Sequence, residues 1–354
     1  MKGLILSGGA GTRLRPITHT AAKQLVPVAN KPVLFYGLEA MRAAGIAEVG
    51  IVVGDTRAEI EEAVGDGGRF GLSVTYLPQE APLGLAHAVL ISESFLGDEP
   101  FVMYLGDNLL KEGIKRFVET FRQSAPDALI LLQKVDDPRS YGIAELDGEG
   151  CVARLVEKPA EPRSDLALVG VYLFTPAIFT SVKAITPSDR GELEITDAIQ
   201  HMVDRGLRVE PHVVTGWWKD TGKLEDMLEA NRLVLSTIER DVRGEVPETT
   251  IEGPVVIGSG SRVERCTVRG PVVIGARCRI SDSFVGPYTS ISDGVVVDHA
   301  ELEHSIVLEN SRISRLGARM TDSLIGRDCV IAHNDARPVA YRFLVGDSSR
   351  IGIL

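Results

Sequence analysis

The stretch KGLILSGGAGTRLRP (residues 2–16) decides how the first half of the chain folds. Its apolar start, residues 4–6, predicts a buried strand, and the glycine-rich run SGGAG (residues 7–11) follows at once. Glycines adopt positive φ without strain and let successive backbone N–H groups point at one anion. Arg13 and, further along, Lys23 add full positive charges. Neither GxGxxG nor GxxxxGK[ST] matches in register, but the combination favours a loop that binds nucleotide phosphates over an ordinary turn.

The composition is that of a soluble globular protein. The chain has 354 residues, of which 44% are hydrophobic and 25% charged, and it is long enough for two domains with separate cores. The formal net charge of −11 argues against nucleic acid or an anionic membrane as a partner, so a phosphate site must be a local basic island. The 4 cysteines lack metal-binding spacing, and no signal peptide or membrane-spanning run is visible. We therefore expect reduced thiols and a cytoplasmic location.

Residues 1 to about 110 alternate short apolar strands with helices. Lys31-Pro32 is expected to open one of these helices, with proline near its first position. Alternation of this kind predicts a mostly parallel sheet covered on both faces. Ligands bind beyond the carboxyl ends of such strands, where the glycine loop and Asp107 both lie.

The pattern changes toward antiparallel strands from Asp127 onward. One pair of these strands flanks the turn DGEG (residues 147–150) and predicts a hairpin. An amphipathic helix begins near Leu224 and leads out of this region. The first domain is therefore expected to be an α/β domain with a mixed sheet, spanning residues 1–243.

Residues 244–335 contain an internal repeat of 17 residues. Within each repeat the aliphatic positions step by 6, 6 and 5, which is typical of a parallel β-helix with three short strands per coil. Cys278 and Cys329 fall in one register and are expected in its core. The tail, residues 336–354, leaves the repeat and is expected to fold back or to reach a partner chain. The aliphatic series are Ile257, Ile274, Ile291, Leu308 and Ile325; Ile251, Val268, Val285 and Leu302; and Val263, Ile280 and Val297.

Two motifs, GGAGTRLRPIT (residues 8–18) and KQLVP (residues 23–27), resemble the signature of the sugar-phosphate nucleotidyltransferases. The Lys-Gln-Leu form is similar to that of the glucose-1-phosphate thymidylyltransferases. The resemblance covers about residues 1–240 and implies a Rossmann-like mixed-sheet domain. The repeat resembles the left-handed parallel β-helix (hexapeptide repeats) of the family's long members. The short members end instead in a helical segment with a regulatory site, so that regulation is not carried over.

The reaction that the resemblance implies is attack by a phosphate oxygen of glucose 1-phosphate, or of a related sugar 1-phosphate, on the α-phosphorus of dTTP. Pyrophosphate leaves. Because the substrate supplies the nucleophile, the protein must align two polyanions and neutralise charge as it moves. The implied cofactor is Mg²⁺, since a few carboxylate oxygens completed by phosphates suit its octahedral coordination.

The resemblance also implies which residues form the site. Arg13 and Lys23 match the residues that hold the triphosphate, and Lys158 matches the lysine that binds the sugar phosphate. Asp107 and Asp220 match the two Mg²⁺ ligands. The nucleotide-binding residues are Leu6, Gly8, Gly9, Gly11, Thr12, Arg13, Gln24, Gln79 and Gly84. The sugar-phosphate pocket comprises Tyr141, Gly142, Glu157, Lys158 and Val169.

Three other functions stay open. Uridylyl or guanylyl transfer could use the same scaffold. The β-helix could transfer acetyl groups, with His299, His304 or His333 as the base. A catalytically dead regulatory subunit is disfavoured, because the charged motif positions are intact.

Some residues depart from the family pattern. His87 stands where glutamine is common, and Lys219 and Lys223 alter the segment around the second aspartate. These departures bear on sugar specificity rather than on the reaction. We also expect a homo-oligomer, because stacked or side-by-side β-helices bury their flat faces.

Overall fold

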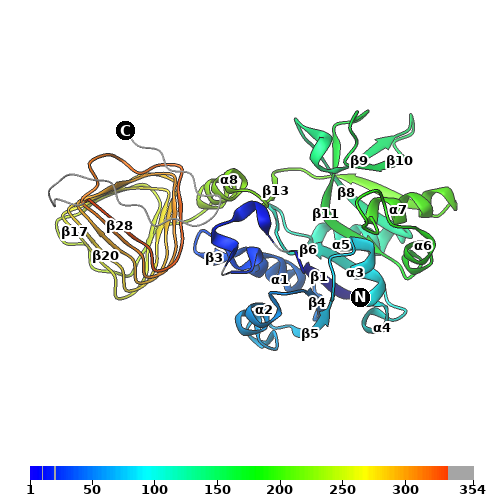
Figure 1. Cartoon of the computed structure of the whole chain (residues 1–354), viewed down its shortest axis with the longest axis horizontal. Coiled ribbons are helices and arrows are strands. Elements are labelled where there is room, and N and C mark those ends of the chain that lie inside the picture. The colour runs from blue at the N-terminus through cyan, green and yellow to red at the C-terminus, as the bar shows by residue number, and fades with distance from the viewer. Residues whose placement is uncertain (10, 20, 334–354) are drawn as a thin grey trace. The chain divides into compact units, whose positions relative to one another are not determined.

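The structure is a computed structural model that describes residues 1–9, 11–19 and 21–333 (Figure 1). These residues divide into two compact units. Along the chain the units part after Asp220, and the domain boundary at residue 243 stays a prediction. The tail, residues 336–354, lies outside the described residues. The first unit holds residues 1–9, 21–25 and 33–220, and the second holds residues 11–19, 26–32 and 221–333.

A nine-stranded mixed sheet forms the centre of the first unit, in the order β10-β9-β11-β6-β1-β4-β5, with β8 beside β11 and β12 beside β8. The strands β5, β4, β1 and β6 are parallel neighbours, whereas β8, β9 and β10 belong to antiparallel pairs. The expected change of pattern and the hairpin are therefore confirmed. The strands are β1 (Lys2–Ser7), β4 (Glu48–Val53), β5 (Ser73–Pro78), β6 (Phe101–Leu105), β8 (Ala128–Lys134), β9 (Gly142–Leu146), β10 (Val152–Glu157), β11 (Leu166–Phe174) and β12 (Val209–Val213).

Both faces of this sheet are buried. Along β1, Ile5 belongs to one hydrophobic cluster, whereas Leu4 and Leu6 belong to another, because successive side chains of a strand point to opposite faces. A central strand that is buried on both faces explains the uninterrupted apolar run at the start of the chain. The helices of this unit are α1 (Val33–Ala43), α2 (Arg57–Val64), α3 (Leu85–Ile91), α4 (Glu93–Leu96), α5 (Lys115–Ser124), α6 (Ile178–Ala184) and α7 (Ile195–Asp204).

The start of α1 differs from the expectation. Lys31–Pro32 form the short strand β3, which pairs with β2 (Pro27–Val28), and the helix begins only at Val33. Ala29 and Asn30 connect the two strands with positive φ at both positions, the geometry of a two-residue hairpin turn. The prediction that Lys31-Pro32 opens the helix is therefore wrong by two residues, because the turn pairs these residues back onto β2.

The second unit contains a β-helix built of three parallel ladders (Figure 1). The first is β14 (Asp241–Val242), β16 (Val255–Ile257), β19 (Val272–Ile274), β22 (Thr289–Ile291), β25 (Ile306–Val307) and β27 (Leu324–Ile325). The second is β15 (Thr250–Glu252), β18 (Thr267–Arg269), β21 (Phe284–Val285) and β24 (Glu301–Leu302). The third is β17 (Arg262–Glu264), β20 (Arg279–Ser281), β23 (Val296–Asp298), β26 (Arg312–Ser314) and β28 (Val330–Ala332).

The corners of the coils repeat a left-handed backbone conformation. At one corner Arg265, Asp282 and His299 follow one another at intervals of 17 residues, each with φ between 47° and 51°. Short parallel strands joined by such corners in stacked sheets agree with the expected left-handed parallel β-helix. Single residues in this conformation are tolerated because each is fixed by the ladders on both sides.

One of the three aliphatic series is wrong in register. Ile257, Ile274 and Ile291 pair as expected, but Ile291 then pairs with Val307 and not with Leu308. From 291 to 307 is 16 residues, and from Val307 to its next partner Ile325 is 18, so a short coil is followed by a long one. Val307 and Leu308 are both buried, and an aliphatic pair of this kind hides a shift of one residue from any count of the repeat.

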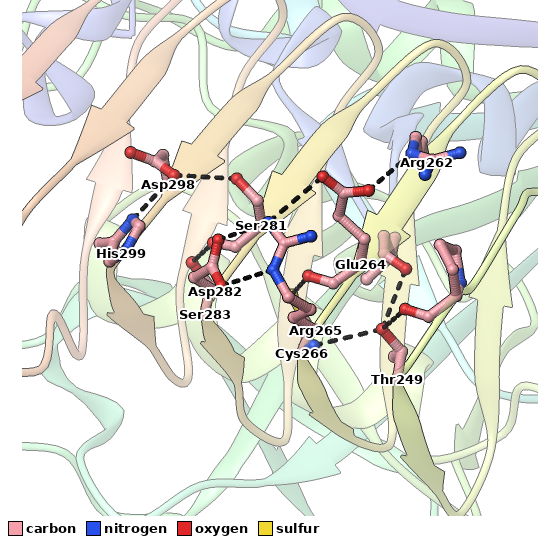
Figure 2. Close-up of polar contacts among 12 residues, drawn as sticks. Thr249, Arg262, Glu264, Arg265, Cys266, Ser281, Asp282, Ser283, Asp298 and His299 are labelled. Carbon is pink, nitrogen blue, oxygen red and sulfur yellow. Dashed lines mark hydrogen bonds and ion pairs between the residues drawn. The ribbon is translucent and has the colours of Figure 1, made fainter.

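Hydroxyl side chains satisfy the backbone at the corners. Thr249 accepts a hydrogen bond from the backbone N–H of Cys266 at 3.2 Å, and Ser261 does the same for Cys278 at 2.9 Å (Figure 2 shows the first of these). Burial raises the pKa of both thiols, so they stay protonated, as expected for core cysteines. Cys151, by contrast, is exposed in the first unit.

The helix α8 (Leu224–Leu235) also belongs to the second unit, together with the β2–β3 hairpin. The buried Asn231 on this helix accepts from the backbone N–H of Ala29 at 2.8 Å and from the hydroxyl of Ser290 at 2.6 Å. Its amide nitrogen donates to the carbonyl oxygen of Tyr288 at 3.0 Å. One asparagine thus ties hairpin, helix and β-helix together. Within the described part of the chain, no helix combines the length and the apolar content needed to cross a bilayer.

Candidate active site

The glycine loop leaves the carboxyl end of β1, which lies between β4 and β6 at the centre of the parallel strands. A Cβ atom at Gly8 would lie 3.2 Å from Oε1 of Gln79, and one at Gly9 would lie 3.2 Å from Cε of Lys23. Contacts this short are tighter than most side chains make, so both positions favour glycine. The loop therefore brings two predicted nucleotide-binding side chains against its own backbone.

Lys23 and Asp107 form an ion pair across 84 residues of sequence. Lys23 lies in the short 3₁₀ turn η3 (Lys23–Leu25), and Asp107 follows the end of β6. Both side chains are largely buried, at 15% and 13% exposure. Burial by itself raises the pKa of Asp107, but the Lys23 ammonium and the Asn108 amide outweigh it and hold that pKa below its usual range. The carboxylate is therefore ionised at neutral pH.

Asp220 comes close to Asp107 through a small two-stranded ladder. Strand β13 (Trp218–Asp220) runs antiparallel to β7 (Asn108–Leu110) and places Asp220 opposite Asn108. The indole N–H of Trp218 donates to the side-chain oxygen of Asn108, whose amide donates to Asp107 at 2.9 Å. The two predicted metal ligands are thus neighbours across one ladder, an arrangement that could hold a Mg²⁺ ion.

The predicted base-binding segment lies beside the glycine loop. Nε2 of Gln79 lies 3.3 Å from the carbonyl oxygen of Gly84 and 3.0 Å from Nδ1 of His87. Gly84 precedes α3 with φ 103°, and a Cβ there would lie 2.4 Å from the carbonyl oxygen of Leu193, so no other residue fits. The start of α3 therefore holds the side chain of Gln79 in one place.

Three further residues of this region are buried. Leu6 is a core residue of β1 whose carbonyl oxygen accepts from the N–H of Gly106 at 2.9 Å. Gln24 is 1% exposed, and its Oε1 has no hydrogen-bond partner among the described residues; the same holds for the hydroxyl of Ser7. Leaving buried polar atoms unsatisfied costs about 1–3 kcal/mol each. Such atoms beside a phosphate loop are suited to a ligand that completes their hydrogen bonds.

The sugar-phosphate residues meet where β9 and β10 pair. Glu157 lies opposite Gly142, and a Cβ at Gly142 would lie 3.0 Å from Oε2 of Glu157 and 2.5 Å from Thr196. The hydroxyl of Thr196 donates to that same oxygen at 3.2 Å. Nζ of Lys158 lies 3.4 Å from Glu157 and is 41% exposed, so it can reach an anion in solvent. The Tyr141 ring packs edge-on against Trp218, which connects this group to the aspartates.

Carboxylates crowd around Glu157. Arg190 lies 3.4 Å from Glu157 and 3.5 Å from Glu194, and it is the shared counter-charge of both. Burial raises the pKa of Glu194, and the nearby charge of Glu157 adds to this increase against the opposing Ser188 hydrogen bond. Burial and Glu157 likewise raise the pKa of Asp197. A pocket edge with this many acceptors is suited to the hydroxyl groups of a sugar.

Val169 is placed differently from the other predicted sugar-site residues. Its side chain is fully buried in the core cluster that also contains Ile5 and Trp218. The register of β11 against β8 shifts between Leu168 and Tyr172, so this part of the strand leaves the regular ladder. Only the backbone of Val169 is therefore in a position to touch a ligand.

Gly11, Thr12 and Arg13 belong to the second unit and are described there. Gly11 has φ 61° and precedes the 3₁₀ turn η1 (Thr12–Leu14), and its carbonyl oxygen accepts from the hydroxyl of Thr18 at 2.6 Å. Thr12 and Arg13 are both exposed, and no ion pair to Arg13 is formed by the described residues. Its guanidinium is therefore available for an anion.

Comparison with known proteins agrees with this geometry. Residues 2–237, two thirds of the chain, match the family model described as nucleotidyl transferase. The chain belongs to the nucleotidyl transferase family. A protein of Streptomyces antibioticus named glucose-1-phosphate thymidylyltransferase is 56% identical over 100% of this chain and 99% of its own length. A Streptomyces griseus protein of the same name is 57% identical with the same coverage, and the Haloferax volcanii low-salt glycan biosynthesis nucleotidyltransferase Agl11 is 48% identical over 99% of both chains.

Solved structures match the first two thirds of this nucleotidyl transferase. A putative glucose-1-phosphate thymidylyltransferase from Bacillus anthracis, in complex with a sucrose, is 37% identical with a TM-score of 0.62. It covers 66% of this chain and 94% of its own. A UDP-glucose pyrophosphorylase complexed with UDP-glucose is 28% identical with a TM-score of 0.59, over 66% of this chain and 98% of its own.

The histidines of the β-helix form no comparable site in this nucleotidyl transferase. The ligand atoms of Asp282, Asp298 and His299 lie within 4.8 Å of one another (Figure 2). However, Arg265 holds both carboxylate oxygens of Asp282 at 2.7 and 2.8 Å, so a cation would have to displace a guanidinium. His304 is hydrogen-bonded to Asp322 at 2.6 Å. These contacts stabilise corners of the coil, and we assign no metal to them.

Several residues that complete the site were not selected from the sequence. Asn108 and Trp218 position the aspartates, Thr196 and Arg190 hold Glu157, and His87 contacts Gln79. Each lies within or next to a motif that the sequence analysis quotes. The motif position alone does not say which neighbour supports the functional side chain.

Proposed function

We propose that this nucleotidyl transferase moves a thymidylyl group from dTTP to glucose 1-phosphate and releases pyrophosphate. The substrates come from the names of the two Streptomyces relatives, which match the whole chain. The observation that carries the reaction type is the Lys23–Asp107 pair against Gly9, at the ends of neighbouring parallel strands. It brings a phosphate-binding ammonium group and a metal-binding carboxylate to one point of the glycine loop.

In the proposed reaction a phosphate oxygen of the sugar attacks the α-phosphorus of dTTP. One P–O bond forms, the bond from the α-phosphorus to the bridging oxygen breaks, and negative charge moves onto the leaving pyrophosphate. Lys23 binds the triphosphate and stabilises that charge, because a fixed cation in a largely buried place is stronger than one in water. Arg13 stays a prediction for the same task.

Asp107 and Asp220 are proposed to hold Mg²⁺. The two carboxylates come from adjacent positions of the β7–β13 ladder, and the lowered pKa of Asp107 keeps that ligand ionised. Two hard oxygen ligands leave room for the phosphate oxygens and waters that Mg²⁺ prefers. The ion would supply positive charge to the triphosphate oxygens when bound.

Glu157, Lys158 and Tyr141 are proposed to bind glucose 1-phosphate. Glu157 is oriented by Thr196 and accepts from sugar hydroxyls, whereas the half-exposed ammonium of Lys158 binds the phosphate. Lys158 adopts φ 41° and donates its backbone N–H to the carbonyl oxygen of Tyr141 at 3.0 Å. This places the lysine and the aromatic ring at one edge of the pocket.

A pyrophosphate-release screen tests this proposal. Purified protein is mixed with each common nucleoside triphosphate, a panel of sugar 1-phosphates and Mg²⁺. The expected result is the highest kcat/KM for dTTP with glucose 1-phosphate and no turnover after Mg²⁺ is chelated. A clear preference for UTP or GTP would replace the proposed nucleotide, and consumption of acetyl-coenzyme A would assign chemistry to the β-helix. A homo-oligomer and a cytoplasmic location stay predictions.

A further inference from the structure

The amide group of Gln79 has a defined orientation. The carbonyl oxygen of Gly84 can only accept a hydrogen bond, so the side-chain atom 3.3 Å from it must be the amide nitrogen. The same nitrogen lies 3.0 Å from Nδ1 of His87. Both hydrogens of the amide are therefore used, one by Gly84 and one by His87. Nδ1 of His87 must be the unprotonated, accepting nitrogen of a neutral ring.

The other end of the amide is left for a ligand. Oε1 of Gln79 faces the glycine loop, at 3.2 Å from the position of a Cβ on Gly8. No donor to this oxygen is found in the part of the chain that the structure describes, and the side chain is only partly buried. A side chain at residue 8 would cover the oxygen. The site therefore offers an acceptor here and no donor, although a free glutamine could offer either.

An acceptor in this place distinguishes the pyrimidine bases. Thymine and uracil carry a hydrogen on ring nitrogen N3, whereas N3 of cytosine is an acceptor. An oxygen held against N3 binds the first two bases and opposes the third, since two acceptors cannot share a hydrogen. Turning the amide over would reverse this preference.

We propose that His87 is a positioning residue that sets base selectivity by holding Gln79 with its oxygen toward the base. This inference rests on the proposed function, because it assumes that the base of the nucleotide binds at Gln79. His87 lies in the first turn of α3, three residues after Gly84, so one helix start supplies both acceptors for the amide. Gly84 alone fixes one hydrogen, and the imidazole nitrogen fixes the other.

The test is a double-mutant cycle read as a ratio. The kcat/KM values for dTTP and dCTP are measured with saturating glucose 1-phosphate for the wild type, His87→Leu, Gln79→Leu and the double variant. His87→Leu is expected to lower the dTTP to dCTP ratio about tenfold, the usual effect of one misplaced hydrogen bond, mainly through the KM for dTTP. In the Gln79→Leu background, the same change is expected to leave the ratio unaltered.

Two further variants separate orientation from shape. His87→Asn places an accepting oxygen where Nδ1 was, since both atoms are bonded to Cγ, and it should restore the ratio. His201→Leu makes the same exchange as His87→Leu on α7, where the ring contacts Ser181 at 3.0 Å, and it should leave the ratio unchanged.

Specific results would overturn the inference. An unchanged ratio in His87→Leu, or an effect of equal size with and without Gln79, would mean that His87 does not act through the amide. A wild type that prefers UTP to dTTP would overturn the proposed nucleotide only, because uracil carries the same N3 hydrogen. In that case the UTP to CTP ratio tests His87 in the same cycle.

Discussion

Replacing Asp107 by asparagine should destabilise the first unit even without substrate. The exchange keeps the shape of the side chain and an oxygen for the Asn108 amide at 2.9 Å, but it removes the charge that faces Lys23. The asparagine amide would point a donor at the ammonium group, which cannot accept. Lys23 is then a largely buried cation that has lost an ionised partner.

The size of the effect follows from burial. Removing one partner of a fully buried ion pair costs about 3–5 kcal/mol, and losing a charge-assisted hydrogen bond costs about 1.5–3 kcal/mol. Since Lys23 and Asp107 retain 15% and 13% of their exposure, water relieves part of the penalty, and we expect about 2–3 kcal/mol. For a unit of this size that is a fall in Tm of roughly 4–12 °C.

Tryptophan fluorescence is a suitable measurement, because both tryptophans of the chain, Trp217 and Trp218, lie in the first unit. Thermal unfolding is followed at pH 7 without nucleotide or Mg²⁺. The double variant Asp107→Asn/Lys23→Met should recover most of the loss, since it removes the unpaired charge. Glu93→Gln breaks an exposed ion pair with Lys183 in the same unit and should cost less than about 1 kcal/mol. If Asp107→Asn unfolds with the wild type, or if the double variant is less stable than the single one, the reasoning is refuted.

Four other outcomes are expected. Lys158→Ala should lower kcat/KM for the sugar phosphate about 10- to 150-fold with little change in nucleotide binding, whereas an equal loss for both substrates would place the lysine elsewhere. Asp220→Asn should abolish Mg²⁺-dependent turnover, and near-normal rates at saturating Mg²⁺ would remove it from the metal site. Because the folded-state pKa of Asp197 is raised, its ionisation opposes folding at pH 7, so Asp197→Asn should raise Tm at pH 7, and the gain should vanish as the pH falls below the ordinary aspartate pKa of about 3.9. Light scattering should find an oligomer, and a monomer would contradict the role in assembly expected for the β-helix.

The repeating parts of the fold were predictable from the sequence because burial imposes a period. The apolar run of residues 4–6 is a central strand, and the aliphatic series of the β-helix reports an inward position in every coil. The period fails only where two neighbouring aliphatics, Val307 and Leu308, are both buried, since either one satisfies the pattern. The short coil and the long coil that follow Ile291 are decided by backbone pairing, which no count of apolar residues contains.

Two elements show where local signals were insufficient. The helix α5 (Lys115–Ser124) buries only Phe117, Val118 and Phe121, and the sequence analysis does not predict it. At Lys31-Pro32 the proline is a fair helix-start signal, but the positive-φ turn before it forms a strand pair first. Tertiary packing and turn geometry override propensity in both cases.

The site shows the same division between kinds of residue and their contacts. A glycine loop with lysines and aspartates at strand ends predicts phosphate and metal chemistry, and the structure places Lys23, Asp107 and Gln79 around that loop. That Lys23 would hold Asp107, 84 residues away, depends on the packing of the whole sheet. Val169 illustrates the limit of transfer by motif, because its side chain is in the core and only its backbone remains for a ligand.

The segments for the two substrates are joined by backbone hydrogen bonds at Gly84. Leu193 donates its N–H to the carbonyl oxygen of Leu83 at 2.8 Å and accepts from the N–H of Ala86 at 3.0 Å. Leu193 stands directly before Glu194 and the start of α7, which carries Thr196 onto Glu157. A glycine at 84 allows this approach, since a Cβ would lie 2.4 Å from the Leu193 carbonyl oxygen, and its own carbonyl oxygen holds Gln79. One residue thus fixes the base-reading amide and the distance to the sugar pocket, because aligning two bound substrates requires both to be held on one rigid frame.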